Sequence, residues 1–416
     1  MRVLVATESR FDRTPDGVHW NVAWAKYEFW RRYLDVFDEV CVLARVRDVS
    51  TIPTGGVRAD GPNVSFSPLP YYLGPWEYLR KYPSLRLAAR RAIRADDALI
   101  VRAPGPMSGL VTGRIGNTGR PFGIEVVGDP GETFAPGAVR SVLRPILRHV
   151  LPWVLRRQCA RASAVAYVTS HLLPELYPAP RATHVTDYSS IDLPDAAFVS
   201  TSRPRRALLE TSRLVCVGSL EAMYKGPDVL LDALALAIRR GASLQLTWVG
   251  DGKYRPEMAA RAAQSGLDRN VRFVGHLPPG EMIRKELDSA DLFVLVSRTE
   301  GLPRALIEAM ARGLPCVGSN AGGIAALLSP AEQVPIGAAV PLADKILEVL
   351  NDPDRLARLS QENLLKARAY HADMLRPRRR NFYETVRDAT LRWQTGRLSR
   401  HGKTTSHTRH GSSMVE

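Results

Sequence analysis

The stretch SRTEGLPRALIEAMARGLPCVGSNAGG, residues 297–323, decides how the second half of this chain is interpreted. It follows the continuous apolar run 291–297, which is typical of a parallel strand buried on both faces. Pro303 suits the first position of a helix, and Gly313 suits its C-terminal cap. The stretch therefore predicts a helix over 303–312 whose N-terminus lies at the carboxyl end of a buried strand.

Two carboxylates in this stretch point to a binding site. Glu300 lies in the loop before the helix, where free helix N–H groups could hold a phosphate or a sugar hydroxyl. Glu308 lies among apolar residues, where a carboxylate is costly to bury unless donors such as a pair of sugar hydroxyls meet it. The alternative is an exposed charge ladder, because Arg304 and Arg312 lie four residues to either side of Glu308.

The rest of the chain alternates short apolar runs with helical patterns. Helices are expected at 22–33 and 140–161, and the alternation restarts at about Arg213. The apolar runs of the first half lie at 2–6, 39–43, 98–101, 122–127 and 164–168. Such alternation predicts βαβ units and parallel sheets. The fold class is therefore α/β, with two Rossmann-like doubly wound domains facing each other across a cleft, where ligands bind at the carboxyl ends of the strands.

The domain boundaries follow the same pattern. We predict an N-terminal domain at 1–195, a polar linker at 196–212 and a C-terminal domain at 213–375. A C-terminal helix at 376–395 is expected to pack back on the N-terminal domain. The basic tail 396–416 has almost no core-forming residues, so we expect it to be disordered.

The composition is that of a soluble globular protein. The 416 residues are 45% hydrophobic and 24% charged, and no run of eighteen apolar residues predicts a membrane-spanning helix. The N-terminus MRVLVATESR is interpreted as a buried strand and not as a signal peptide. The four cysteines are far apart, which favours reduced core cysteines in a cytoplasmic protein.

The formal net charge of +15 indicates an anionic partner or surface. Much of the excess lies in two basic stretches with apolar residues between the charges, 78–97 and 140–161. In the second, Arg140, Arg144 and Arg148 recur every four residues on one helical face, which suits an anionic membrane. A solvated helix on a soluble enzyme is the alternative. No nucleic-acid-binding motif accompanies the charge, so nucleic acid is not expected as a partner.

Further strands of the second half end in glycine. Gly218 ends the first of them, in VCVGSLEAMYKGPDVLLDAL (215–234), and Lys225 is placed to reach an anion at that end. Gly250 and His276 follow later strands, in LTWVGDGKY and RFVGHLP. The Walker spacing of a P-loop is absent, and Lys225 alone could be an ordinary surface lysine.

Together these stretches resemble the nucleotide-sugar-binding domain of GT-B glycosyltransferases. The resemblance is to the retaining family 4 group of bacterial cell-surface polysaccharide synthesis, with its two glutamates separated by seven residues. It is strong over 213–330 and weaker over the N-terminal half, which it makes the acceptor-binding domain. It implies that Glu300 binds the donor sugar, that Glu308 binds the ribose hydroxyls and that Lys225 neutralises the diphosphate.

The resemblance extends to the residues around these three. Backbone groups of Gly301, Leu302 and Pro303 would surround the sugar and phosphate. Residues near Gly250 and His276 would line the nucleotide, beside Gly218. Catalysis would be mainly electrostatic and would require neither a cofactor nor a divalent metal. The Asp-x-Asp sequence at Asp352 is interpreted as a helix start and not as a metal site.

Two departures from the family pattern matter. Many members have an arginine where this chain has Ser219, so a second phosphate-binding cation is missing or comes from Arg298 or Arg304. In the N-terminal half, Asp129 stands where many members place a histidine. It could contact the acceptor or the donor sugar, or it could simply form the turn before Pro130. Gly17 is expected near the diphosphate by position only.

These features predict a retaining hexosyl- or hexosaminyltransferase. It would move a sugar from a UDP- or GDP-sugar to a glycan or lipid-linked acceptor, working in the cytoplasm or peripherally on the inner membrane face. One alternative is a GT-B-fold epimerase or phosphorylase, which would share the nucleotide or phosphate site. Another is a non-catalytic basic binding protein, motivated by the net charge alone.

Overall fold

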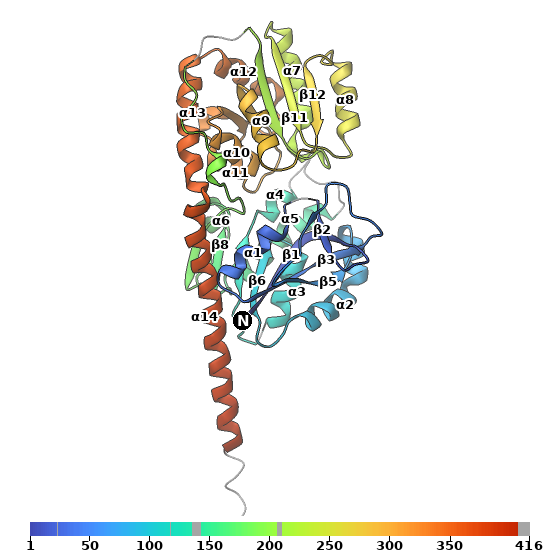
Figure 1. The fold of residues 1–416 in the computed structure, drawn as a ribbon, viewed down its shortest axis with the longest axis vertical. Coiled ribbons are helices and arrows are strands. Elements are labelled where there is room, and N and C mark those ends of the chain that lie inside the picture. The colour runs from blue at the N-terminus through green and yellow to red at the C-terminus, as the bar shows by residue number, and fades with distance from the viewer. Residues whose placement is uncertain (23, 117, 135–142, 206–209, 407–416) are drawn as a thin grey trace, which may run out of the picture.

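The computed structural model describes residues 1–406 except 23, 117, 135–142 and 206–209. Figure 1 shows two α/β domains, one above the other, with a long C-terminal helix along one side of both. No helix in the described part of the chain is both long and apolar enough to cross a bilayer.

The N-terminal domain is built on one sheet with strand order β4-β2-β1-β6-β7-β8-β9, and β3 and β5 extend it on the other side of β1. The strands are parallel apart from the hairpin additions β2 and β4. They are β1 (Arg2–Arg13), β2 (His19–Asn21), β3 (Glu39–Asp48), β4 (Val57–Arg58), β5 (Val64–Pro70), β6 (Ala98–Ala103), β7 (Gly123–Val126), β8 (Ala164–Tyr167) and β9 (His184–Asp187). Each apolar run predicted for this half overlaps one of these strands, although the runs 122–127 and 164–168 extend slightly beyond β7 and β8.

Helices cover both faces of this sheet, as a parallel sheet requires. On one face α2, α3, α5 and α6 enclose an apolar cluster, and on the other α1, η1 and part of α14 enclose a second. The elements are α1 (Tyr27–Arg31), η1 (Arg32–Asp35), α2 (Gly74–Ala92), α3 (Pro106–Ile115), α4 (Pro130–Thr133), α5 (Arg144–Cys159), α6 (Leu172–Leu176) and η2 (Asp195–Ala197).

The C-terminal domain has a fully parallel sheet of strand order β12-β11-β10-β13-β14-β15. Its strands are β10 (Ser212–Val217), β11 (Leu244–Val249), β12 (Val271–Gly275), β13 (Leu292–Leu295), β14 (Cys316–Ser319) and β15 (Gln333–Val334). The order reverses between β10 and β13, and ligands of doubly wound sheets bind outside the carboxyl ends at such a point. The predicted fold class is confirmed.

The helices of this domain surround a single apolar core. Helix α10 follows β13 as predicted, with Pro303 at its N-cap. The elements are η3 (Met223–Lys225), α7 (Pro227–Arg239), α8 (Arg255–Gln264), α9 (Glu281–Ser289), α10 (Arg304–Ala311), α11 (Gly322–Leu327), η4 (Pro330–Glu332), α12 (Ala339–Leu350), α13 (Pro353–Ala367), η5 (Arg368–Tyr370) and α14 (Ala372–Ser406).

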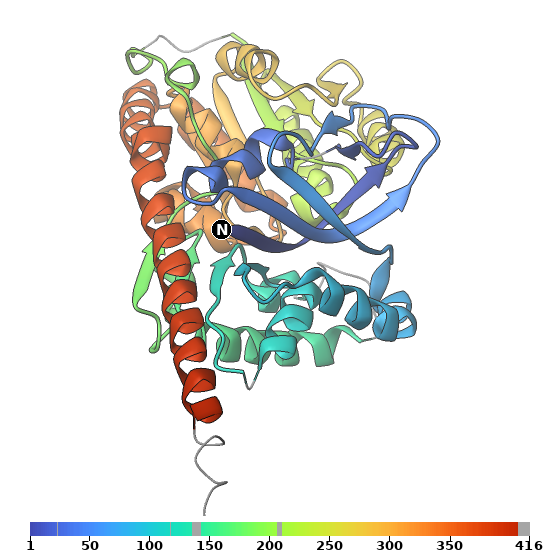
Figure 2. The ribbon, with the colours of Figure 1, turned by 60° about the horizontal axis from the view of Figure 1, so that its bottom comes forward.

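Helix α14 connects the two domains. It leaves the C-terminal domain at η5, contacts β6 to β9 of the N-terminal sheet and runs beyond the body of the molecule (Figure 2). Gly123 on β7 makes room for it, because a Cβ there would lie 2.9 Å from the Phe382 ring and still closer to Val386. The expected disorder of 396–416 is wrong for 396–406, which continue α14, because extending an anchored helix costs little. Residues 407–416 lie outside the described residues.

Two other helix predictions need correction. The helix expected at 22–33 is shorter, since α1 begins only at Tyr27 and continues as η1. Before it, Asn21 Oδ1 accepts a hydrogen bond from the Ala25 amide. The helix expected at 140–161 is seen as α5, Arg144–Cys159, and Arg140 lies outside the described residues. Other predictions are confirmed, since the four cysteines are free and buried and Asp352 caps α13.

Candidate functional site

An ion pair between Lys225 and Glu300 lies where the strand order of the C-terminal sheet reverses. Lys225 Nζ is 2.6 Å from Glu300 Oε2, and Ser297 Oγ donates to the same oxygen at 2.9 Å. The two side chains are only 11% and 13% exposed. Burial lowers the pKa of Lys225, but the Glu300 carboxylate outweighs it and raises that pKa overall. In the described part of the chain no hydrogen bond reaches Glu300 Oε1.

Glycines allow the backbone to pack tightly around Lys225. Gly250 has φ +138°, and a Cβ there would collide with the carbonyl oxygen of Gly218. That oxygen also accepts a hydrogen bond from Trp248 Nε1 at 2.9 Å. Ser219 stands where the resemblance expects a cation, and its hydroxyl accepts a bond from the Glu221 amide instead. The ends of β10 and β11 therefore present backbone and one lysine.

The glycine-rich turn after β14 packs directly on the loop that carries Glu300. The Gly323 amide donates to Glu300 O at 3.1 Å, and a Cβ on Gly323 would overlap Gly301. Gly322 has φ +38°, and a Cβ there would collide with Glu300 O. Two glycines are therefore needed for the turn to support the loop 300–303, in which Leu302 is half-buried and Pro303 is buried.

Glu308 does not belong to a charge ladder. Arg312 pairs with Asp288 at 2.7 Å through Nε and at 2.8 Å through Nη2, so it is not available to Glu308. Burial raises the pKa of the half-buried Glu308, although Arg304 nearby lowers it. No hydrogen bond or ion pair of Glu308 is formed with another described residue. Its carboxylate is left available to an outside donor.

Arg298 holds the loop that carries Lys225. Its guanidinium forms two bonds to Asp228, 3.0 Å to Oδ1 and 2.6 Å to Oδ2, and a third to Met223 O at 2.6 Å. Its amide donates to Tyr224 O at 2.6 Å. Burial raises the pKa of Asp228, but the Arg298 bonds lower it overall, as expected for a strong bidentate pair. Of the two candidate substitutes for the missing cation, Arg298 is already neutralised.

Asp129 is engaged by its own domain. It is the N-cap of α4, and its Oδ1 accepts hydrogen bonds from the Gly131 amide at 2.7 Å and from the Tyr177 hydroxyl. These contacts are those of the turn-forming alternative, in which Asp129 shapes the loop before Pro130. Its catalytic role stays a prediction.

The same N-terminal loop reaches the C-terminal domain through a residue that sequence reasoning missed. This residue is Glu132, which accepts hydrogen bonds from the amides of Glu300 and Gly322 and from Thr299. Burial and the neighbouring Asp129 raise its pKa overall, although these bonds lower it. A Cβ on Gly301 would lie 2.8 Å from Val127 O. No local pattern marks Glu132, because its partners are more than 160 residues away in the chain.

Two predicted residues lie further out. His276 is exposed after β12, and its Cδ2 is 3.9 Å from where a Cβ on Gly55 of the N-terminal domain would stand. Gly17 has φ +83° in the turn between β1 and β2, where its amide donates to Thr14 O at 2.9 Å. The described contacts of Gly17 keep it with its own hairpin and do not bring it to Lys225.

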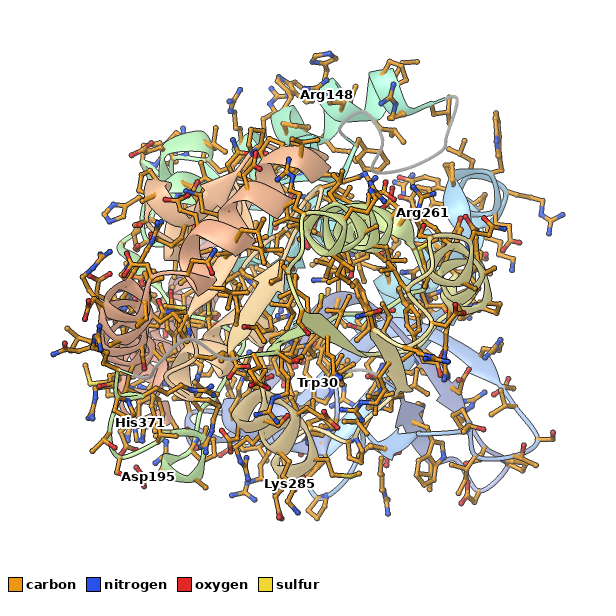
Figure 3. The ribbon with its side chains drawn as sticks, turned by 90° about the horizontal axis from the view of Figure 1, so that it is seen from above. Trp30, Arg148, Asp195, Arg261, Lys285 and His371 are labelled. Carbon is orange, nitrogen blue, oxygen red and sulfur yellow. The ribbon has the colours of Figure 1, made fainter. Side chains whose placement is uncertain are left out.

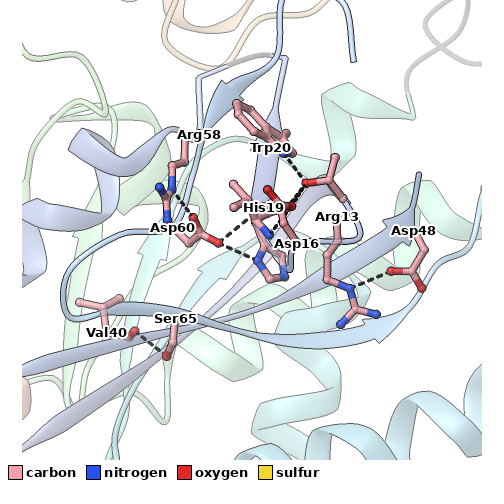
Figure 4. Close-up of polar contacts among 11 residues, drawn as sticks. Arg13, Asp16, His19, Trp20, Val40, Asp48, Arg58, Asp60 and Ser65 are labelled. Carbon is pink, nitrogen blue, oxygen red and sulfur yellow. Dashed lines mark hydrogen bonds and ion pairs between the residues drawn. The ribbon is translucent and has the colours of Figure 1, made fainter. Parts of the chain in front are cut away.

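The hairpin of β2 borders a hollow in the N-terminal domain of about 690 Å³, the size of a ligand pocket. Asp60 lines it and accepts hydrogen bonds from Arg58 Nε at 2.7 Å and from the His19 amide at 2.9 Å (Figure 4). The His19 ring stacks on Phe66 with centroids 4.4 Å apart. This hollow is separate from the Lys225 and Glu300 group in the residues that line it.

Comparison with known proteins decides what this arrangement is. Residues 211–352, which contain Lys225, Glu300 and Glu308, match the family of group 1 glycosyl transferases. The structure of HepE from Anabaena in complex with UDP and glucose superposes with a TM-score of 0.63 at 16% identity, over 92% of this chain and 100% of HepE. The chain has the GT-B fold, and residues 211–352 form a glycosyltransferase domain.

Relatives of this glycosyltransferase are distant in sequence. It is 25% identical over 299 residues to protein CapJ of Staphylococcus aureus, which covers 71% of this chain and 73% of CapJ. It is 27% identical over 243 residues to a GDP-mannose-dependent monoacylated alpha-(1-6)-phosphatidylinositol monomannoside mannosyltransferase of Corynebacterium glutamicum. That alignment covers 55% of this chain and 60% of the relative.

Proposed function

We propose that this glycosyltransferase moves a hexosyl or hexosaminyl unit from a UDP- or GDP-sugar, with retention of configuration. The acceptor is a glycan or a lipid-linked glycan of cell-surface polysaccharide synthesis. The observation that carries the donor assignment is the Lys225–Glu300 pair at the point where the sheet order reverses. The names of two similar proteins support it, since HepE was solved with UDP and glucose and the Corynebacterium relative is GDP-mannose-dependent.

In this proposal each side chain of the group takes one part of the donor. Lys225 has two further N–H groups for the diphosphate, while Glu300 fixes its position. Glu300 Oε1 accepts from a sugar hydroxyl. Glu308 accepts from the two ribose hydroxyls, which supply the donors that the protein does not. Gly250 and His276 border the nucleotide.

The chemistry follows from charge. The C1–O bond of the donor breaks with both electrons on the phosphate oxygen, the acceptor oxygen bonds to C1 on the same face, and its proton passes to that phosphate oxygen. Cations and helix N–H groups that face the leaving diphosphate lower the barrier by stabilising its developing charge. We propose that the reaction needs neither a cofactor nor a divalent metal, because these groups do that work.

We further propose that the enzyme works in the cytoplasm on the inner membrane face. Helices α2 and α5 cover the same sheet face, and their outer sides carry exposed apolar residues among arginines. Trp76, Ile146 and Trp153 are 66%, 61% and 54% exposed. The sequence of α5 holds four arginines and no acidic residue. We call these outer sides the basic face; such a surface fits an anionic bilayer.

A thermal-shift screen against UDP, GDP, ADP and their sugars tests the donor assignment. A ligand that binds only the folded state raises the melting temperature. At a hundred times its Kd it raises the free energy of unfolding by about 2.7 kcal/mol. We expect UDP or GDP to stabilise the wild type and to lose this effect in Glu308→Ala. Glu281→Ala, on exposed α9, is the matched control and should keep it. If no nucleotide shifts the wild type at millimolar concentration, the donor assignment is wrong.

A further inference from the structure

The site described above has one cation, Lys225, to bind a diphosphate that carries two or more negative charges. Lys225 shares its charge with Glu300 at 2.6 Å, so it neutralises a diphosphate only in part. Ser219 brings no charge, and Arg298 is neutralised by its two hydrogen bonds to Asp228. A nucleoside diphosphate at this place, as in the proposed function, therefore needs a further positive group.

Arg304 is that group by position. It is the first residue of α10, directly after the loop 300–303, and its charge is felt by both Glu308 and Glu300. The side chain is exposed, and no hydrogen bond or ion pair joins it to another described residue. Arg304 is therefore a solvent-accessible arginine close in sequence to Glu300 of the Lys225–Glu300 pair, and among the described residues it has no bonding partner.

The surroundings of Arg304 also point to an outside anion. Burial by the surrounding residues lowers its pKa, and so does the like charge of Arg102 on β6 of the facing domain. Glu308 and Glu300 act in the opposite direction and do not compensate. Arg102 is itself paired with Glu125, so burial is the main cause of the lowered pKa of Arg304. An anion that reaches this arginine would stabilise its charge. The N–H groups at the start of α10 favour an anion at the same place.

We propose that Arg304 is the second diphosphate-binding cation and takes the role left open by Ser219. With the donor bound, its guanidinium contacts phosphate oxygens of the diphosphate. During transfer it stabilises the electron pair that departs with the nucleoside diphosphate. This proposal rests on the proposed function and adds a residue to it.

The test compares a nucleoside diphosphate with the matching monophosphate. By calorimetric titration, Arg304→Gln should weaken binding of the diphosphate about tenfold to a hundredfold, as loss of a charge-assisted contact does. Binding of the monophosphate should change much less. Arg304→Lys should restore part of the affinity, and kcat should fall together with diphosphate affinity in Arg304→Gln.

Controls separate the possible results. Arg312→Gln, at the other end of α10 and bound to Asp288, should leave both affinities unchanged. The melting temperature of Arg304→Gln should not fall, because the side chain has no protein partner to lose. Equal affinity of Arg304→Gln and wild type for the diphosphate, or an equal loss for both nucleotides, would overturn the proposal. Failure of the wild type to bind either nucleotide would instead overturn the proposed function.

Discussion

Glu308 differs from an ordinary surface glutamate in its lack of a bonding partner in the described part of the chain. Among the described residues it has no donor, although burial raises its pKa. Arg312, which the sequence offered as a partner, is bound to Asp288 on α9. A carboxylate in such a position costs stability, and the proposed ribose hydroxyls would offset that cost when the donor binds.

A pH series tests this cost. Because the pKa of Glu308 is raised in the folded protein above its ordinary 4.5, the folded state binds the proton more tightly than the unfolded state. The wild type should therefore lose stability relative to Glu308→Gln as the pH rises from about 4.5 through the raised pKa, with no further change above it. Urea unfolding of both proteins between pH 4 and 8 measures the difference. A difference that stays constant over this range would contradict the assignment.

The Lys225–Glu300 pair makes a second prediction. Removing one partner of a largely buried pair leaves the other charge uncompensated, at a cost of about 3 kcal/mol. Lys225→Met and Glu300→Gln should each lower the free energy of unfolding, and the double variant should lose less than the sum of the two. Urea denaturation of the four proteins gives the coupling. Additive losses would show that the pair does not interact in solution.

At the scale of elements, the loop 300–303 is held between two others. Behind it the turn at Gly322 and Gly323 packs on its backbone, and in front of it lies Val127 of the N-terminal domain. The loop thus belongs to the interface between the domains. Small residues are needed behind it, at Gly322 and Gly323, and within it, at Gly301.

Gly301→Ala should disturb this interface. The added Cβ would lie 2.8 Å from Val127 O, which is backbone and cannot move alone, so the two domains must separate slightly. Catalysis depends on geometry held to well within an ångström, and we expect kcat to fall about a hundredfold with little change in nucleotide affinity. Gly128→Ala is the matched control, because, its chain neighbours aside, no atom of a described residue lies within 4 Å of its added Cβ. Equal kcat values for the two variants would contradict the close approach.

Much of this architecture could be predicted from local sequence. Strand β13, helix α10 and the glycine turns follow from apolar runs, Pro303 and Gly313, because their signals lie within a few residues. The capture of Asp129 by Tyr177 and of Arg298 by Asp228 could not be predicted, since the partners are 48 and 70 residues apart. Glu132 reaches Glu300 and Gly322 only after both domains have folded and met.

In the whole molecule, the proposed membrane-binding surface and the proposed donor site lie on different domains. The basic face lies on α2 and α5 of the N-terminal domain. The residues proposed to bind the donor, Lys225, Glu300 and Glu308, belong to the C-terminal domain. Figure 3 shows Arg148 on α5 and Lys285 on α9 at opposite edges.

Vesicle flotation tests the basic face. The wild type should float with vesicles rich in anionic phospholipid at low salt, and less so at high salt, because each basic residue contributes about 1 kcal/mol near such a surface. Arg148→Glu combined with Trp153→Ala should reduce flotation severalfold. Lys285→Glu, paired with Glu281 on the other domain, should not. A wild type that stays in the soluble fraction with anionic vesicles at low salt would contradict membrane binding.

A crystal structure of the enzyme with the nucleoside diphosphate that the thermal screen selects would show directly where the donor binds. We predict the diphosphate between Lys225 and the start of α10, with the ribose hydroxyls on Glu308. A nucleotide bound elsewhere, or one at this place that leaves Glu308 without contact, would rule out the proposed donor site.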